Sequence, residues 1–278
     1  MDGWNGRTAR TACLSAVLLC LAGSCSVKED RGDCPVYVTV LTDRFVLKGM
    51  NDGKVSFAGS EPIGQEDINF LRYLRDGYVR ACPREYTRTA VLSGVENALL
   101  SGDALFVRPG FEAGLVWAYG QSFSADADEF VVDAEPHKQF CLVKFLFGGQ
   151  PTAPPDYPWR FRIRAACSGM NIYSLEPLEG DYWAPVGPNA VGEWYGVIPR
   201  QRENKLLLEI YTPYEGGDSG EGKVEYTVDL GSKFEALGYD WTATDLRDVA
   251  VSVGYSAAEV CVEVKDWIGD DSYRDIQI

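Results

Sequence analysis

The sequence is poor in the side chains that most often carry catalysis or hold metals. It contains one histidine, His137, and its eight cysteines include no Cys-x-x-Cys pair. Acyl-transfer triads need a histidine in most forms, and His137 follows a proline in a polar stretch that we interpret as a surface linker. Zinc sites are built from clusters of cysteine and histidine. The composition therefore predicts no catalytic triad and no zinc site.

Positive charge is also scarce. Lysine and arginine total 26 against 41 aspartates and glutamates, which gives a formal net charge of −15. An acidic surface repels phosphate backbones, so nucleic acid is not an expected partner. The acidic run Asp126-x-Asp128-Glu129 lacks the glycine and later glutamate of the helix-loop-helix calcium motif. We interpret it as a solvated loop and predict no metal ligands and no cofactor.

Only one long apolar run is present, Ala12 to Gly23, and it follows Arg7 and Arg10. It is shorter than the roughly 20 residues needed to cross a bilayer, but it suits the core of a secretory signal. It leads into Leu21-Ala-Gly-Ser-Cys25, small residues ahead of a cysteine. We therefore predict a lipoprotein, cleaved before Cys25 and lipidated on its thiol. The alternative is an ordinary signal peptide that leaves Cys25 as a chance thiol.

Five cysteines remain beyond the predicted signal and lipid site. They are Cys34, Cys82, Cys141, Cys167 and Cys261. Outside the cytoplasm they would allow two disulfides at most, and the sequence does not assign any pairing. The last three fall within or at the end of apolar strand patterns, which favours buried free thiols.

Alternation of apolar and polar residues with a period of two recurs along the chain and predicts many strands. The clearest cases are Val36–Leu41, Trp159–Ala165, Leu206–Tyr211, Val224–Leu230, Val249–Tyr255 and Val260–Lys265. Helical signals are few. Many strands without a βαβ rhythm predict an all-β fold of antiparallel sandwiches.

Two local signals are ambiguous or short. Asp76-Gly77 between Ile68–Arg75 and Tyr78–Cys82 predicts a hairpin turn, with a short helix around Ile68–Leu74 as the competing interpretation. Ser232-Lys-Phe-Glu235 resembles a capping box, and Gly238 supplies a helix stop.

The chain divides into four predicted parts. These are a signal peptide at 1–24, a lipidated tether at 25–34, an N-terminal sandwich at 35–135 and a C-terminal sandwich at 136–278. The break is placed in Ala134-Glu-Pro-His137, after an acidic segment and one short strand. The proline-rich stretch Gln150–Pro158 is interpreted as a stiff loop inside the second sandwich.

Two surface features leave alternatives open. Arg160, Arg162 and Arg164 share one strand face and form either a solvent-facing row or a docking surface for an acidic strand. Trp159, Trp183 and Trp194 lie in one loop-rich stretch. They form either a platform for a carbohydrate partner, because tryptophans stack on sugar rings, or core residues, which is their commoner role in sandwiches.

Five motifs follow one another along the chain. The first is Cys25-Ser-Val-Lys-Glu-Asp-Arg-Gly-Asp-Cys34-Pro35, and the second is Leu74-Arg-Asp-Gly-Tyr-Val79. The others are Gly110-Phe111 with Leu115–Tyr119, Tyr157–Ile163 with Ser168-Gly169, and the closing strand Val260–Trp267. In the order and spacing of these motifs, the chain resembles the minor fimbrial anchoring subunits of Bacteroidetes-type fimbriae, in which the second motif is similar to a hairpin of the first domain.

The resemblance implies two tandem Greek-key, transthyretin-like sandwiches and no enzymatic activity. It further implies a lipoprotein of the outer membrane, exposed at the cell surface, that anchors a fimbria or serves as an accessory subunit. Its expected partners are other fimbrial subunits, joined by β-strand addition, and the membrane itself through the lipid on Cys25. The rival hypothesis is a surface lipoprotein that binds glycans for nutrient uptake.

Overall fold

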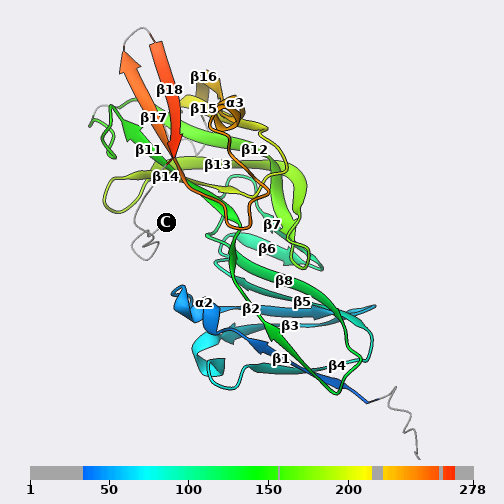
Figure 1. The fold of residues 1–278 in the computed structure, drawn as a ribbon. Helices are drawn as coiled ribbons and strands as arrows, with labels where there is room; N and C mark the ends of the chain where they lie inside the picture. The colour runs from blue at the N-terminus through cyan, green and yellow to red at the C-terminus, as the bar shows by residue number, and fades with distance from the viewer. Residues whose placement is uncertain (1–33, 156, 215–221, 257–258, 267–278) are drawn as a thin grey trace, which may run out of the picture. The chain divides into compact units, whose positions relative to one another are not determined.

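A computed structural model describes residues 34–155, 157–214, 222–256 and 259–266, and these are nearly all β (Figure 1). The predicted signal peptide and Cys25 lie outside the described residues. The strands are β1 (Val36–Leu41), β2 (Asp52–Ala58), β3 (Pro62–Asn69), β4 (Tyr78–Cys82), β5 (Tyr86–Ser93), β6 (Ala98–Ser101), β7 (Ala104–Val107), β8 (Trp117–Ser124), β9 (Glu129–Asp133), β10 (His137–Lys138), β11 (Phe140–Phe147), β12 (Arg160–Asn171), β13 (Pro177–Pro188), β14 (Trp194–Pro199), β15 (Leu206–Pro213), β16 (Gly222–Asp229), β17 (Val249–Ser256) and β18 (Glu259–Asp266). The short helices are α2 (Asp43–Leu47), the 3-10 turn η1 (Phe70–Tyr73) and α3 (Leu230–Ala236).

Two sheets pack face to face in the first part of the chain. One has the order β4-β1-β9 and the other the order β10-β8-β5-β2-β3. In β1 the alternation Val36, Val38, Val40 puts three fully buried valines on the inner face. They share one core with Phe57 of β2 and Phe123 of β8, so both sheets contribute to a sandwich.

The larger sheet runs β16-β15-β12-β13-β14-β11-β17-β18. Its two halves are joined only through β13, which pairs with β12 over most of its length and with β14 only at Gly187 and Pro188. Its inner faces enclose the largest core, built around Phe145, Phe161 and Ile198. The hairpin β6–β7 joins this sheet by pairing with β12. The division of the chain at residue 135 stays a prediction.

The sandwiches are not purely antiparallel. β1 pairs in parallel with β9, and β11 pairs in parallel with β17. Each pair joins strands about 90 to 110 residues apart along the chain, so no local turn signal announces it. The parallel pairing corrects the expected antiparallel pattern, whereas the all-β sandwich architecture is confirmed.

The predicted hairpin at Asp76-Gly77 is wrong. β3 ends at Asn69, whose side chain caps η1 by accepting a hydrogen bond from the Arg72 amide at 3.1 Å. β4 then pairs with β1 and not with β3. The competing interpretation of a short helix is the correct one, because Asn69 favours a cap over a continuing strand.

α3 begins earlier than the capping-box signal indicates. Asp229, and not Ser232, is the N-cap, and its carboxylate accepts from the Ser232 amide at 3.0 Å. The helix ends before Gly238, whose φ of +63° suits a glycine stop. Among the described residues, no helix combines the length and apolar character that a bilayer crossing requires.

Candidate functional site

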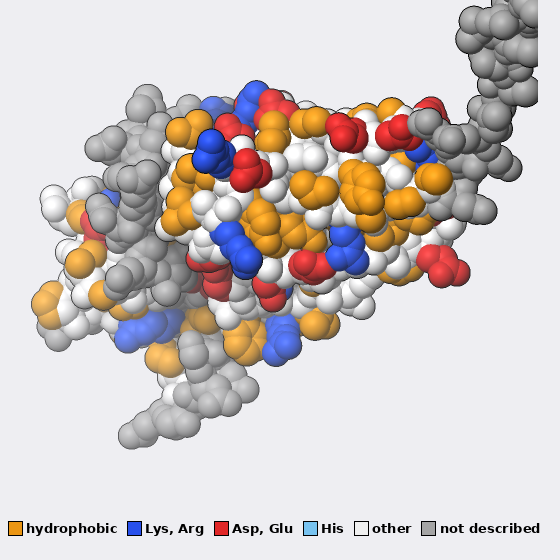
Figure 2. Space-filling view, turned by 90° about the horizontal axis from the view of Figure 1, so that it is seen from below, with side chains coloured by type: hydrophobic (Ala, Val, Ile, Leu, Met, Phe, Trp, Pro, Cys, Tyr) orange, Lys and Arg blue, Asp and Glu red, His pale blue; other side chains and the backbone are white. Residues whose placement is uncertain are grey.

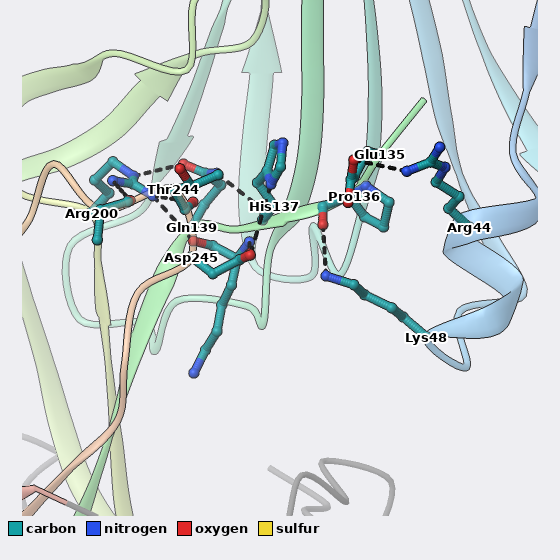
Figure 3. Close-up of polar contacts among 11 residues, drawn as sticks. Arg44, Lys48, Glu135, Pro136, His137, Gln139, Arg200, Thr244 and Asp245 are labelled. Carbon is teal, nitrogen blue, oxygen red and sulfur yellow. Dashed lines mark hydrogen bonds and ion pairs between the residues drawn. The ribbon is translucent and has the colours of Figure 1, made fainter. Parts of the chain in front are cut away.

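The segment from β9 to β11 connects the sheets and is held by polar contacts from both sides (Figure 3). On one side, α2 supplies the contacts. Arg44 forms ion pairs with Asp133 at 2.7 Å and Glu135 at 2.8 Å, and Lys48 donates to the carbonyl of Pro136 at 2.9 Å. The Arg44 pairs are solvent-exposed, so each is expected to contribute about 0–1 kcal/mol.

On the other side the principal contact is Arg200, which directly follows β14. Its side chain is 9 % exposed and donates five hydrogen bonds, which uses every N–H of the guanidinium. The acceptors are Gln139 Oε1 at 2.8 Å and the carbonyls of Lys138, Trp241, Ala243 and Thr244 at 3.3, 2.5, 2.8 and 3.1 Å. Burial lowers the pKa of Arg200, and the five acceptors offset the cost of burying its charge.

Lys138 makes a second buried contact in the same segment. Its Nζ lies 2.5 Å from Asp248 Oδ1, and its amide donates to Asp245 Oδ1 at 2.6 Å. Asp248 also accepts from the Leu142 amide at 2.7 Å. The two side chains of the Lys138–Asp248 pair are 4 % and 10 % exposed. The pair therefore fixes the start of β11 to the loop ahead of β17.

Trp117 at the start of β8 joins the two sides through apolar contacts. It packs against the main core of each sandwich, and its ring meets Phe140 edge to face at 6.1 Å. Lys48 lies 4.4 Å over the ring, within cation–π range. β10 pairs with β8 through Lys138 and Trp117. We name the segment Asp133–Gln139 together with these contacts the clamped connection.

His137 lies inside the clamped connection, as the linker interpretation predicts, but it is not a freely solvated residue. It is a β10 residue of intermediate burial, and its Nδ1 is 3.9 Å from Asp245 Oδ2. Sequence patterns missed Arg200, Lys138 and Asp248. Nothing in their local sequence distinguishes them from other charged residues, because their partners come from distant segments.

The features that suggested chemistry have structural roles. Within the described residues no group of histidine, cysteine or acidic side chains is placed to hold a metal. Arg84 ion-pairs with Asp128 of the acidic run. In the arginine row, Arg162 pairs with Glu209, and Arg164 pairs with Asp181 and Glu209.

Four cysteines lie within the described residues, and three of them, Cys82, Cys141 and Cys167, are free thiols. Cys34 is exposed, whereas Cys82, Cys141 and Cys167 are buried. Burial raises the pKa of the Cys141 thiol to about 12 and that of Cys82 to about 11, so both stay as unreactive thiols. Buried free thiols are thereby confirmed for Cys141 and Cys167, while the side chain of Cys261 lies outside the described residues.

The three tryptophans do not form a common platform. Trp194 is 5 % exposed in the core of the larger sheet, against Phe147 and Phe161. Trp159 contacts Tyr226 and packs against that core, and Trp183 lies beside Gly110, where an added Cβ would meet its ring at 2.9 Å. Trp194 thus has the core role that sandwiches commonly give to tryptophan.

No family model matches the chain, and no curated protein matches its sequence. Solved structures do match. The fimbrial anchor protein Mfa2 from Porphyromonas gingivalis aligns with a TM-score of 0.55 at 8% identity, covering 84% of this chain and 98% of its own. A candidate adhesin from Bacteroides ovatus reaches 0.57 at 9% identity, covering 85% and 94%.

A third structure, a candidate polysaccharide-binding protein from Bacteroides thetaiotaomicron, aligns with a TM-score of 0.53 at 10% identity, covering 84% of this chain and 98% of its own. At such identities the matches establish a shared fold. The family resemblance found in the sequence motifs is therefore confirmed at the level of the fold. This chain has the fold of the fimbrial anchor and candidate adhesin structures solved from these bacteria.

Proposed function

We propose that this protein is an outer-membrane lipoprotein that anchors a cell-surface fimbria or serves as one of its accessory subunits. The observation that carries the proposal is the shared fold with a fimbrial anchor protein along nearly the whole of that protein's length. The signal-like run ending at Cys25 supports the lipid attachment.

The clamped connection supports a role under tension. A subunit between a membrane and a polymer is pulled along its chain, and its weakest point would be an unsupported connection between sheets. Here the connection makes buried contacts through Arg200 and Lys138 and exposed contacts through Arg44. A joint held on both sides resists bending and opening better than a flexible linker.

We further propose that neighbouring subunits join by β-strand addition at an open sheet edge. In the larger sheet β16 and β18 are the terminal strands. In β16 five consecutive residues, Lys223–Thr227, are exposed, which leaves backbone groups accessible to another strand. Main-chain hydrogen bonds would supply the affinity of such a contact.

The anchor is tested by Cys25→Ser, with membrane fractionation and isolation of fimbriae as the measurements. We expect the variant to leave the membrane fraction and the fimbriae to detach from cells. A Cys34→Ser variant, which alters an exposed thiol outside the predicted lipid site, should behave as the wild type. Retention of the Cys25→Ser protein in the membrane would disprove the anchor.

Strand addition is tested by hydrogen exchange on the isolated protein and on its complex with fimbrial subunits. Amides of one edge strand, β16 or β18, should exchange more slowly in the complex. If the complex forms and no edge strand gains protection, the subunits are joined in another way.

A further inference from the structure

The sheet β4-β1-β9 has one buried and one exposed face, and the exposed face is unusually apolar. Its inner face carries the buried valines of β1. On its outer face Tyr37 is 52 % exposed, Val79 52 % and Val131 60 %. Three large hydrophobic side chains on one small sheet leave a considerable apolar area in water.

The strand register places these side chains together. Val79, Thr39 and Val131 lie in one row across β4, β1 and β9. In the next row Tyr37 lies between Ala81 and Glu129. Figure 2 views the molecule from the side on which β1 and β4 lie in Figure 1, and hydrophobic side chains gather there with scattered charges between them. We name these six residues, with Leu41, the outer face.

Carboxylates near the two ends of β9 are neutralised by ion pairs. Asp128 pairs with Arg84 just ahead of β9, and Asp133 at its last residue pairs with Arg44. Two of the three carboxylates there are thus paired, whereas the described ion pairs do not include Glu129, the exposed first residue of β9. Pairing lowers the cost of bringing Asp128 and Asp133 near a surface of low polarity.

The outer face belongs to the sheet whose strand β1 follows the predicted tether in the sequence. β1 begins at Val36, eleven residues after Cys25. Fully extended, eleven residues span at most roughly 36–40 Å. A lipid on Cys25 would therefore keep β1 within this distance of the bilayer. A short tether also creates a local concentration in the millimolar range, so even a weak contact would be populated.

We propose that the outer face rests on the lipid bilayer when the protein is anchored, with its side chains at the boundary between headgroups and acyl chains. This inference rests on the proposed lipidation of Cys25. The tether favours the bilayer as the occupant over another protein, because it keeps this sheet within roughly 36–40 Å of lipid at all times. Tyr37 suits the boundary, where tyrosine is enriched in membrane proteins.

The net charge of the protein specifies the kind of membrane. At −15 the chain is repelled by anionic lipid, so the contact must come from apolar side chains and not from charge attraction. A zwitterionic phosphatidylcholine surface is therefore the appropriate probe. The outer face should bind it only while the lipid anchor is present, because three half-exposed side chains are too few for durable binding alone.

The test uses the lipidated full chain in phosphatidylcholine vesicles, with an environment-sensitive fluorophore on an introduced cysteine. A Cys34→Ser, Cys261→Ser background removes the exposed thiol of Cys34 and the thiol of Cys261, whose side chain lies outside the described residues. Val131→Cys carries the label on the outer face, and Val191→Cys, at a position 73 % exposed beyond β13, is the matched control. We expect a blue-shifted emission and quenching by headgroup-attached nitroxide for position 131, and neither for position 191.

Each outcome decides the inference. A protein that floats with the vesicles while both labels stay water-like and unquenched overturns the membrane contact and leaves the anchor intact. A protein that does not float overturns the anchor, and the contact with it. A label at position 131 that is already shielded without vesicles shows that a second copy covers the face, which also overturns the proposal.

Discussion

The two sides of the clamped connection differ in how far their ion pairs are exposed to solvent. On the α2 side, Arg44 reaches Asp133 and Glu135 across solvent, with side-chain exposures of 42%, 52% and 53%. On the other side, Lys138 and Asp248 pair at 4% and 10% exposure, and Arg200 is equally enclosed. Solvent screens an exposed pair, so its loss changes the free energy of unfolding little. Breaking a buried pair lowers the free energy of unfolding strongly, because it leaves an uncompensated buried charge. We infer that the buried side determines how firmly the connection is held.

The largest effect is expected from Lys138→Met. It leaves Asp248 buried without its cationic partner, and we expect a loss of about 3–5 kcal/mol in the free energy of unfolding. Denaturant unfolding of the purified soluble chain measures it. Lys205→Met, in an exposed pair with Glu203, is the matched control and should stay within about 0.5 kcal/mol. An equal, small effect for both variants would contradict the comparison.

A somewhat smaller loss is expected from Arg200→Lys. An ammonium keeps the charge but cannot reach five acceptors in the planar geometry of a guanidinium, so several carbonyls lose their donor. We expect about 2–3 kcal/mol by denaturant unfolding, together with faster hydrogen exchange at Gln139. If the lysine variant is as stable as the wild type, the five hydrogen bonds do not hold the connection.

Glu112, which lies between β7 and β8, extends the comparison from buried ion pairs to a buried carboxyl. Its Oε1 is enclosed without a hydrogen-bond partner, and burial raises its pKa from 4.5 to about 7, although a backbone hydrogen bond with Val197 opposes the shift. The folded protein therefore holds this proton between pH 4.5 and 7 after the unfolded chain has released it. Stability from this group is present at low pH and is lost as pH rises through that window.

Glu112→Gln should remove this pH dependence. Because the residue is of intermediate exposure overall, we discount the shift and expect a gain of about 1–2 kcal/mol at pH 8, with little change at pH 4. Unfolding measured across the pH range checks it. A variant whose stability changes in parallel with the wild type would show that Glu112 is not the titrating group.

The smallest effect is expected from Arg44→Ala on the exposed side. We expect a loss below about 1 kcal/mol that shrinks further at high salt, because both of its ion pairs are screened. Unfolding at low and at molar salt measures the difference. A loss comparable to that of Lys138→Met would mean that the two sides contribute equally.

Period-two alternation predicted six of the strands that the structure describes. The strands that overlap their predicted ranges are β1, β12, β15, β16, β17 and β18. This succeeds because a half-buried strand must alternate, whatever it pairs with. The hairpin predicted at Asp76-Gly77 was wrong for a related reason. A turn signal indicates that the chain reverses, but it does not identify the strand with which the chain then pairs. β4 pairs with β1, about 40 residues away.

The sequence alone determined the properties that depend on composition and local pattern. These are the acidic charge, the shortage of catalytic and metal-binding side chains, the secretory signal ending at Cys25 as a prediction, and the all-β character. Tertiary structure alone decided the parallel pairs, the hydrogen-bond acceptors around Arg200 and the burial of Lys138. Those depend on contacts between segments far apart along the chain, which local periodicity does not encode.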